Sequence, residues 1–160
     1  MSEVDNNVVS EPTLEPRVAI YVDDSPGDRH LFEAYHGRSI RESGLELHVF
    51  TNPHDAIEAL RALGRRVMFI VTDLNMNSDT DAGHRVARAA RQADIDYVVI
   101  NTGEPALVAH KLEKDSGIHL VDKNEPHTLR EWIAGIVKKI TPIIVQPSDD
   151  IDNGITRLSA

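Results

Sequence analysis

Cysteine is absent from this chain of 160 residues, which excludes disulfides, cysteine-ligated zinc and thiol nucleophiles. Long apolar runs are also missing, because no segment approaches the ~18 apolar residues of a membrane span. Residues 1–16 have neither the basic cluster nor the apolar core of a signal peptide. Positive charge is scarce, and the net charge of −9 argues against general affinity for nucleic acids. We therefore expect a soluble, cytoplasmic protein that contacts neither membrane nor nucleic acid.

The acidic side chains are concentrated at the two ends of the chain. Residues 1–16 carry four acids and no base, and residues 141–160 carry three acids and one arginine. Both ends are polar, contain proline and lack a clear period, which predicts a flexible acidic N-terminal tail and a flexible C-terminal tail. Within the second tail, Pro142 to Val145 is apolar enough to pack on the domain or to pair with a partner. Residues 17–140 remain as one domain, within the usual ~100–200 residues.

From Arg17 onward, short apolar runs alternate with segments of helical period. The expected strands are 18–22, 45–49, 66–72, 97–100 and 118–121, and the expected helices are 26–43, 53–63, one around 86–93, 104–114 and 126–140. Strict alternation predicts an α/β fold with a parallel sheet and helices on both faces. Only the second strand alternates, with Leu45, Leu47 and Val49 expected inward, which is typical of an edge. The prediction is a flavodoxin-like, doubly wound, five-stranded parallel sheet in the order 2-1-3-4-5.

Polar residues follow four of the expected strands: Asp23 and Asp24, then Asp73, Thr102 and Lys123. In such a sheet ligands bind beyond the carboxyl ends of the strands, so we expect these side chains to converge. Two like charges ~4 Å apart repel by ~4 kcal/mol at an effective dielectric of ~20, so three carboxylates would shift their pKa values or recruit a cation. Mg²⁺ is the natural one, because it takes a few carboxylates, keeps waters and accepts phosphate oxygens.

This combination of charges suits phosphoryl transfer. Mg²⁺ and Lys123 together would cancel the three negative charges, so that a phosphoryl group could approach an aspartate, a known covalent acceptor. Thr102 could donate a hydrogen bond to a phosphoryl oxygen, and catalysis would consist of positioning and charge neutralisation. Each residue taken singly also fits turn chemistry, a cap or a solvated charge. The four strand ends taken together favour the functional interpretation.

The motifs Asp23-Asp24, Val71 to Met76 around Asp73, Asn101-Thr102-Gly103 and Val121-Asp122-Lys123 complete a five-point pattern. In these residues the segment 17–140 resembles a two-component response-regulator receiver domain of the stand-alone, chemotaxis-regulator kind. The resemblance implies that Asp73 is the phosphoacceptor and that Thr102 and Lys123 engage the phosphoryl group. It also implies that Asp23, Asp24 and Asp73 hold magnesium together with the backbone carbonyl of Asn75.

The resemblance also implies the partners of the reaction. The phosphoryl donor would be a phosphohistidine on a histidine kinase or on a histidine phosphotransfer protein in a phosphorelay. The chain would catalyse its own phosphorylation and dephosphorylation rather than act as a metabolic enzyme. Because only 20 residues follow Ile140, output is expected through protein contacts or onward phosphotransfer, and a homodimer remains open.

Three positions depart from the family pattern. Leu120 stands where an aromatic residue is frequent, and Asn124 and Asn77 stand where proline is common. The catalytic residues therefore match the family while the residues that relay the signal differ. Asn75 and Glu104 occupy positions that tune phosphoryl lifetime in the family, and their small or polar side chains predict a short-lived phosphoaspartate.

Two other functions remain as alternatives. The altered relay residues suit an interaction module that works without phosphorylation. The same acidic site would also suit a magnesium-dependent phosphohydrolase, although no general acid is evident. The eight histidines are expected to be scattered surface residues, because none is paired at i, i+4 on one helix face.

Overall fold

The computed structural model describes residues 15–112 and 117–141. The predicted tails lie outside this range except at their inner ends, and so does the apolar segment 142–145. At the inner end of the N-terminal tail, Arg66 donates a hydrogen bond from Nε to the carbonyl of Pro16 at 3.1 Å. The same Nε lies 3.5 Å from the Glu15 carboxylate.

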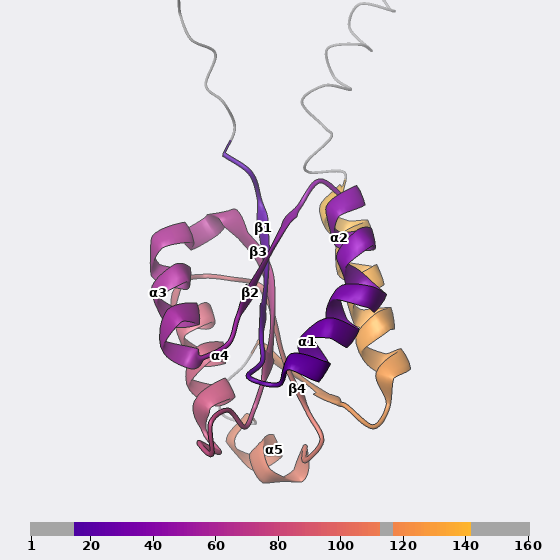
Figure 1. Ribbon diagram of the computed structural model, residues 1–160. Helices are drawn as coiled ribbons and strands as arrows, with labels where there is room; N and C mark the ends of the chain where they lie inside the picture. The colour runs from indigo at the N-terminus through magenta and orange to yellow at the C-terminus, as the bar shows by residue number, and fades with distance from the viewer. Residues whose placement is uncertain (1–14, 113–116, 142–160) are drawn as a thin grey trace, which may run out of the picture.

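A five-stranded parallel sheet forms the centre of the domain, as predicted from the sequence (Figure 1). Its strands are β1 (Val18–Val22), β2 (Glu46–Phe50), β3 (Val67–Asp73), β4 (Tyr97–Thr102) and β5 (Ile118–Asp122). The strand order is β2-β1-β3-β4-β5, and the pairs are parallel. This confirms the flavodoxin-like topology, because parallel strands need the helical crossovers that the sequence pattern indicated.

Helices cover both faces of the sheet (Figure 1). They are α1 (Pro26–Phe32), the π-helical segment η1 (Glu33–Gly37), α2 (Arg38–Glu42), α3 (Pro53–Leu63), the 3₁₀ turn η2 (Gly64–Arg66), α4 (Ala82–Gln92), α5 (Ala106–Leu112) and a C-terminal helix over 126–141. The first three run on without a break, so the single helix expected after Pro26 is present with a π-helical stretch in its middle. None of the helices in the described residues is long and apolar enough to cross a bilayer.

The alternation of side chains along the strands builds two apolar layers. On β1, Val18, Ile20 and Val22 pack in the layer that includes residues of α3 and α4. Ala19 and Tyr21 point to the opposite layer, under α1, α2 and the C-terminal helix. Because both faces are covered, β1 is buried at all five positions, as a central parallel strand requires.

Helix ends follow the local signals in the sequence. Asn52 caps α3 by accepting a hydrogen bond from the backbone N–H of Asp55 at 2.9 Å, with Pro53 in the first turn. Gly64 ends the helix with a positive φ of 54°, a conformation that favours glycine. These residues bound the helix expected over 53–63 at both ends.

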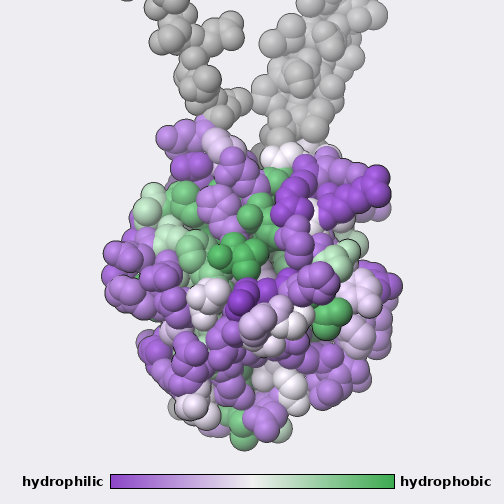
Figure 2. Space-filling view, viewed as in Figure 1, coloured by the Kyte–Doolittle hydropathy of each residue, from purple (hydrophilic) through white to green (hydrophobic). Residues whose placement is uncertain are grey.

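Two apolar side chains that strand alternation and helical period predict to face inward, Val49 and Leu107, are exposed instead. Val49 is 40 % exposed and Leu107 is 53 % exposed. Val49 lies on the edge strand β2, where Figure 2 shows hydrophobic surface between the two helix layers. On α5 the neighbouring Val108 is the buried residue, since one short helix turns only one stripe towards the core.

Candidate functional site

Strand register brings the acidic residues together at the carboxyl edge of the sheet. Val22 of β1 lies opposite Thr72 of β3, so the next residues, Asp23 and Asp73, leave the sheet side by side. Asp23 is fully buried, and Asp73 is 9 % exposed. One carboxylate oxygen from each of Asp23, Asp24 and Asp73 lies within 4.8 Å of the others. The convergence expected for these three side chains is present.

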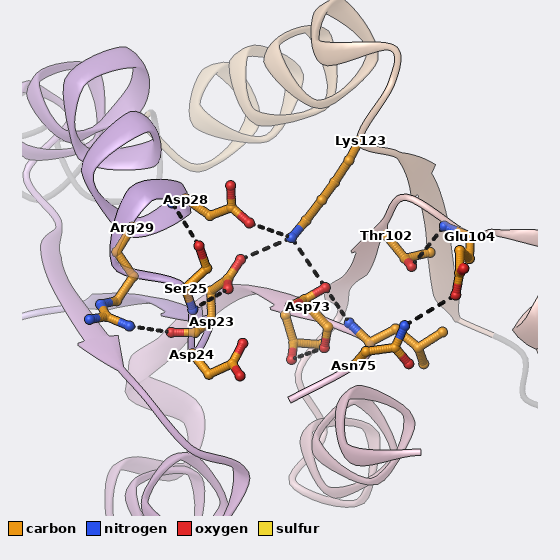
Figure 3. A network of polar contacts seen from close by, with 12 residues as sticks. Asp23, Asp24, Ser25, Asp28, Arg29, Asp73, Asn75, Thr102, Glu104 and Lys123 are labelled. Atoms are coloured by element: carbon orange, nitrogen blue, oxygen red, sulfur yellow. Dashed lines mark hydrogen bonds and ion pairs between the residues drawn. The ribbon is translucent and has the colours of Figure 1, made fainter. Parts of the chain in front are cut away.

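Lys123 reaches this acidic cluster from the far side of β4 (Figure 3). Its Nζ lies 3.0 Å from Asp23 Oδ2 and 3.2 Å from Asp73 Oδ1. A third carboxylate, that of Asp28, accepts a hydrogen bond from the same Nζ at 3.0 Å. The backbone N–H of Lys123 donates to the carbonyl of Thr102 at 2.9 Å, which fixes the start of the lysine side chain at the end of β4. One ammonium group therefore serves three acids.

Burial and charge act in opposite directions on the two central groups. Burial raises the pKa of Asp73 to about 6, although Lys123 counteracts this and Asp23 adds to it. For Lys123, burial alone would lower the pKa, but the carboxylates of Asp23 and Asp73 more than offset it, and the pKa lies above its ordinary value. At neutral pH the lysine is consequently charged, and Asp73 is close enough to its titration range to respond to added positive charge.

Asp23 is held by the strand and helix that flank it. The Tyr21 hydroxyl donates to Asp23 Oδ2 at 2.8 Å, and the backbone N–H of Ser25 donates to Oδ1 at 2.9 Å. Arg29 donates from Nη1 to the backbone carbonyl of Asp23 at 2.9 Å. Burial, followed by the charge of Asp23, raises the pKa of Tyr21, so its hydroxyl keeps the proton that it donates. The buried carboxylate is thus hydrogen-bonded at both oxygens.

Asp28 is a site residue that the sequence interpretation missed. Ser25 caps α1 by accepting a hydrogen bond from the Asp28 backbone N–H at 3.3 Å, and Pro26 occupies the first turn. This start places the Asp28 side chain at the same edge as the strand ends. The available signal was the expected helix start at Pro26, because an acid in the first turn of that helix faces the carboxyl edge.

The loop after β3 borders the site and contacts Asp24. Met76 and Asp79 pair their backbones in a tight turn whose central residues, Asn77 and Ser78, have φ values of 52° and 64°. The turn aims the Asn77 backbone N–H at Asp24 Oδ2, at 2.8 Å. A proline at position 77 would lack this N–H, so asparagine there has a local structural reason.

Glycine at position 83 lets the loop return close to β3. The Gly83 backbone N–H donates to the Leu74 carbonyl at 2.8 Å. A Cβ at this position would lie 1.9 Å from the backbone oxygen of Asp73. Only glycine allows this approach, so the phosphoacceptor candidate and the start of α4 are packed backbone to backbone.

Asn75, Thr102 and Glu104 form the other wall of the site (Figure 3). Thr102 is 1 % exposed, and its Oγ1 accepts a hydrogen bond from the Glu104 backbone N–H at 3.1 Å. The Asn75 amide donates to Glu104 Oε2 at 3.4 Å, while its Oδ1 is buried without a hydrogen-bond partner. Thr102 is therefore placed at the end of β4 as expected, with its oxygen engaged by the loop that follows.

The positions that depart from the family pattern have ordinary local structure. Leu120 is partly buried against the layer that contains α4. No cis peptide bond occurs in the described residues, so the Lys123–Asn124 bond is trans. Asn124 donates from its backbone and from its side chain to Asp122 Oδ1, at 2.9 and 3.0 Å.

The histidine expectation is wrong at two positions. His36 is 8 % exposed and His84 is 7 % exposed, while the other described histidines are more exposed. Burial, followed by the charge of Arg130, lowers the pKa of His36. Its ring, on η1, packs against Phe32 of α1 at 4.9 Å between centroids, which explains why a histidine is buried there.

Comparisons with known proteins identify solved structures with a similar fold. No family model and no curated protein matches the chain. A crystal structure of a response regulator receiver protein from Sinorhizobium medicae WSM419 matches with a TM-score of 0.57 at 22 % identity, over 78 % of this chain and 96 % of that one. The chain has the receiver fold.

Two further receiver structures support the same conclusion. A receiver domain protein from Clostridium thermocellum has a TM-score of 0.56 at 14 % identity, over 79 % of this chain and 98 % of that one. A receiver protein from Pseudomonas putida has a TM-score of 0.51 at 18 % identity, over 76 % and 98 %. The resemblance expected from five residues is thus confirmed for the fold.

Proposed function

We propose that the chain is a single-domain response regulator that accepts a phosphoryl group on Asp73. The observation that carries the proposal is the cluster of the Asp23, Asp24 and Asp73 carboxylates, with Lys123 Nζ 3.2 Å from Asp73 Oδ1. A parallel sheet of the receiver fold supports it, because the site lies at the edge where such sheets bind ligands.

The donor set fits magnesium. Three carboxylates within 4.8 Å of one another are hard oxygen ligands, and all three are partly or fully buried. Asp23, Asp24 and Asp73 would hold the ion, with Asn75 contributing its backbone carbonyl as the family resemblance implies. When bound, Mg²⁺ supplies positive charge for the phosphoryl oxygens.

The residues of the chain can then be given roles. An oxygen of the Asp73 carboxylate forms a bond to phosphorus as the phosphorus–nitrogen bond of a phosphohistidine breaks, and the electron pair of that bond returns to the imidazole. Lys123 stabilises negative charge on the phosphoryl oxygens, and Thr102, whose Oγ1 accepts from the Glu104 N–H, donates its hydroxyl proton to one of them. Tyr21 and Ser25 hold Asp23 in place.

The proposed partners follow from this chemistry. The donor is a histidine kinase or a histidine phosphotransfer protein, and the output is a protein contact or onward transfer of the phosphoryl group. The side chains of Asn75 and Glu104 contact each other at 3.4 Å, and because both are small or polar we expect a short-lived phosphoaspartate.

A phosphorylation-independent interaction module is the second candidate. It is favoured by one contact: Asp28 gives Lys123 a third carboxylate and so competes with Asp73 for the ammonium group. Under this alternative, partner binding is the same for the parent chain and for Asp73→Asn.

The test is phosphorylation by a small donor with a phosphorus–nitrogen bond. The full chain is incubated with phosphoramidate and Mg²⁺, and its intact mass is measured. A gain of one phosphoryl group is expected for the parent chain and for Asp94→Asn, a matched change of an exposed acid at the opposite edge of the sheet. Asp73→Asn is expected to gain nothing. A gain that survives Asp73→Asn, or no gain in the parent, would overturn the proposal.

A further inference from the structure

A hollow of about 400 Å³ lies at the amino edge of the sheet, at the opposite end from the acidic cluster. Val67 and Met68 at the start of β3 and Tyr97 at the start of β4 supply its apolar side chains. Of these, Met68 and Tyr97 are only partly buried. The hollow therefore joins partly covered apolar side chains to charged groups of both signs, and the charged lining residues are Arg17, Arg65, Asp94 and Asp96.

The C-terminal helix ends beside this hollow. The helix starts after β5 at the carboxyl edge and runs back along the sheet, so its last turn lies at the end of the molecule where β1 begins (Figure 1). Ile140 is 1 % exposed and packs in the same apolar layer as Met68 and Tyr97. The Lys139 Nζ lies 5.9 Å from the centroid of the Tyr97 ring. The chain beyond Thr141 thus starts next to the hollow.

The residues that follow Thr141 match the apolar part of the hollow. They are Pro142, Ile143, Ile144 and Val145. Proline cannot continue the helix, which suits a change of direction at this point. Four residues span ~13 Å at ~3.3 Å each, which is enough to cross a hollow of this size. Apolar side chains on both sides would leave water in that contact, which favours it.

The arginines of the hollow match acids further along the same segment. Arg17 and Arg65 are exposed, and Arg17 donates from Nη1 to the Arg65 carbonyl at 3.0 Å. Within residues 15–112 and 117–141, neither guanidinium forms an ion pair with a carboxylate. Asp149 and Asp150 follow the apolar residues after a short spacer. Because the two aspartates of the lining would repel these acids, the arginine side of the hollow is favoured for them, although exposed pairs of this kind add little affinity.

We infer that residues 142–150 of this chain dock in the hollow, with Ile143 and Ile144 against Met68 and Tyr97 and with the two acids at the arginines. Of the two roles that the sequence leaves open for 142–145, packing on the domain and pairing with a partner, the hollow selects the first. It lies at the opposite edge of the sheet from the acidic cluster, so the inference holds whether or not the chain is phosphorylated.

Disulfide trapping tests the docking, because the chain has no cysteine of its own. Full-length Gln146→Cys/Asp96→Cys carries one thiol after the apolar residues and one in the lining of the hollow. The control, Gln146→Cys/Ser39→Cys, carries the second thiol on the exposed side of α2, which lies beside the C-terminal helix and outside the hollow (Figure 1). Both proteins are oxidised at low concentration, and the disulfide within one chain is followed by intact mass. The first pair is expected to close about fivefold faster than the control pair.

Two sets of isoleucine changes show whether apolar contact causes this preference. Ile143→Ser/Ile144→Ser is expected to bring the two closing rates together. Ile151→Ser/Ile155→Ser removes two isoleucines further along the chain and is expected to leave the difference unchanged. Equal rates in the parent background, or a difference that survives Ile143→Ser/Ile144→Ser, would overturn the docking. Disulfides that join two chains, seen as a doubled mass, would assign the hollow to a second copy and overturn it as well.

A third change tests where the acids lie. Asp149→Asn/Asp150→Asn is expected to reduce the preference for the Asp96→Cys pair about twofold, and Asp152→Asn is the control expected to leave it unchanged. The same preference in all three backgrounds would overturn the contact between these acids and the arginines.

Discussion

The carboxyl edge of the sheet, where the strands end, and the amino edge, where they begin, hold charge in different ways. At the carboxyl edge, Asp23 is completely buried and shares one lysine with Asp73 and Asp28. At the amino edge, Arg66 pairs with Glu15, whose side chain is 73 % exposed, and Asp94 lies in the open. Exposed charges are screened and contribute little, whereas buried ones have to be matched. The difference marks the carboxyl edge as the place where charge is buried and paired.

Removing the shared cation should have the largest effect on stability. Lys123→Met leaves three acids with no ammonium group, so the free energy of unfolding should fall by about 2–4 kcal/mol at pH 7.5 without divalent ions. Urea denaturation measures this. Lys139→Met is the control, because Lys139 is exposed and its Nζ lies 5.9 Å from the Tyr97 ring centroid at the other edge, where a change within about 0.5 kcal/mol is expected. Equal effects of the two variants would remove the contrast between the edges.

Neutralising Asp73 should stabilise the fold at neutral pH. Its pKa is about 6 in the folded protein against 3.8 ordinarily, so the folded state holds this proton more tightly than the unfolded state. The resulting stability is fully present below pH 3.8 and is lost as pH rises through about 6. Asp73→Asn should therefore gain about 1–3 kcal/mol at pH 7.5 in metal-free buffer, shrinking towards zero as pH falls from 6 to 4.

The measurement for Asp73→Asn is urea denaturation at a series of pH values in the presence of a chelator. Asp94→Asn should follow the parent chain throughout, because Asp94 is exposed. A variant at position 73 that is less stable than the parent at pH 7.5 would show that the ion pair with Lys123 outweighs the cost of burial.

The smallest effect is expected for the most exposed member of the lysine network. The Asp28 side chain is 41 % exposed. When its charge is removed, Lys123 still has the carboxylates of Asp23 and Asp73 as partners. Asp28→Asn should change the free energy of unfolding by no more than about 0.5 kcal/mol at pH 7.5, measured by the same urea titration. A loss as large as that of Lys123→Met would mean that the three ion pairs act as one cooperative unit.

Much of the site follows from sequence because its residues stand directly at strand ends. Once the strands are parallel, Asp23, Asp73 and Lys123 must leave the sheet at one edge, and the register of β1 with β3 then puts the two aspartates side by side. Asp28 was missed because its role depends on how α1 turns at Pro26 relative to Lys123, about 95 residues away in the chain. No local sequence pattern shows that the Asp28 and Lys123 side chains come within 3.0 Å of each other.

Burial was predicted less reliably from the sequence for side chains on an edge strand or a short helix. Val49 and Leu107 were expected inward from alternation and helical period, yet an edge strand and a short helix leave apolar side chains exposed. His36 was expected at the surface from its residue type, yet the packing of α1 buries it beside Phe32. Periodicity indicates which side chains share a face but does not say how completely a neighbouring element covers that face.

Taken alone, the amino-acid order determined the alternation of strands and helices, the strand order and the acids and lysine at one edge, because each depends on local period and on the handedness of crossovers. Tertiary structure alone decided that one ammonium group serves three carboxylates and that Asp28 of α1 is one of them. Such contacts join groups that are distant in the chain, and only packing of α1 and the C-terminal helix on the sheet sets their separation.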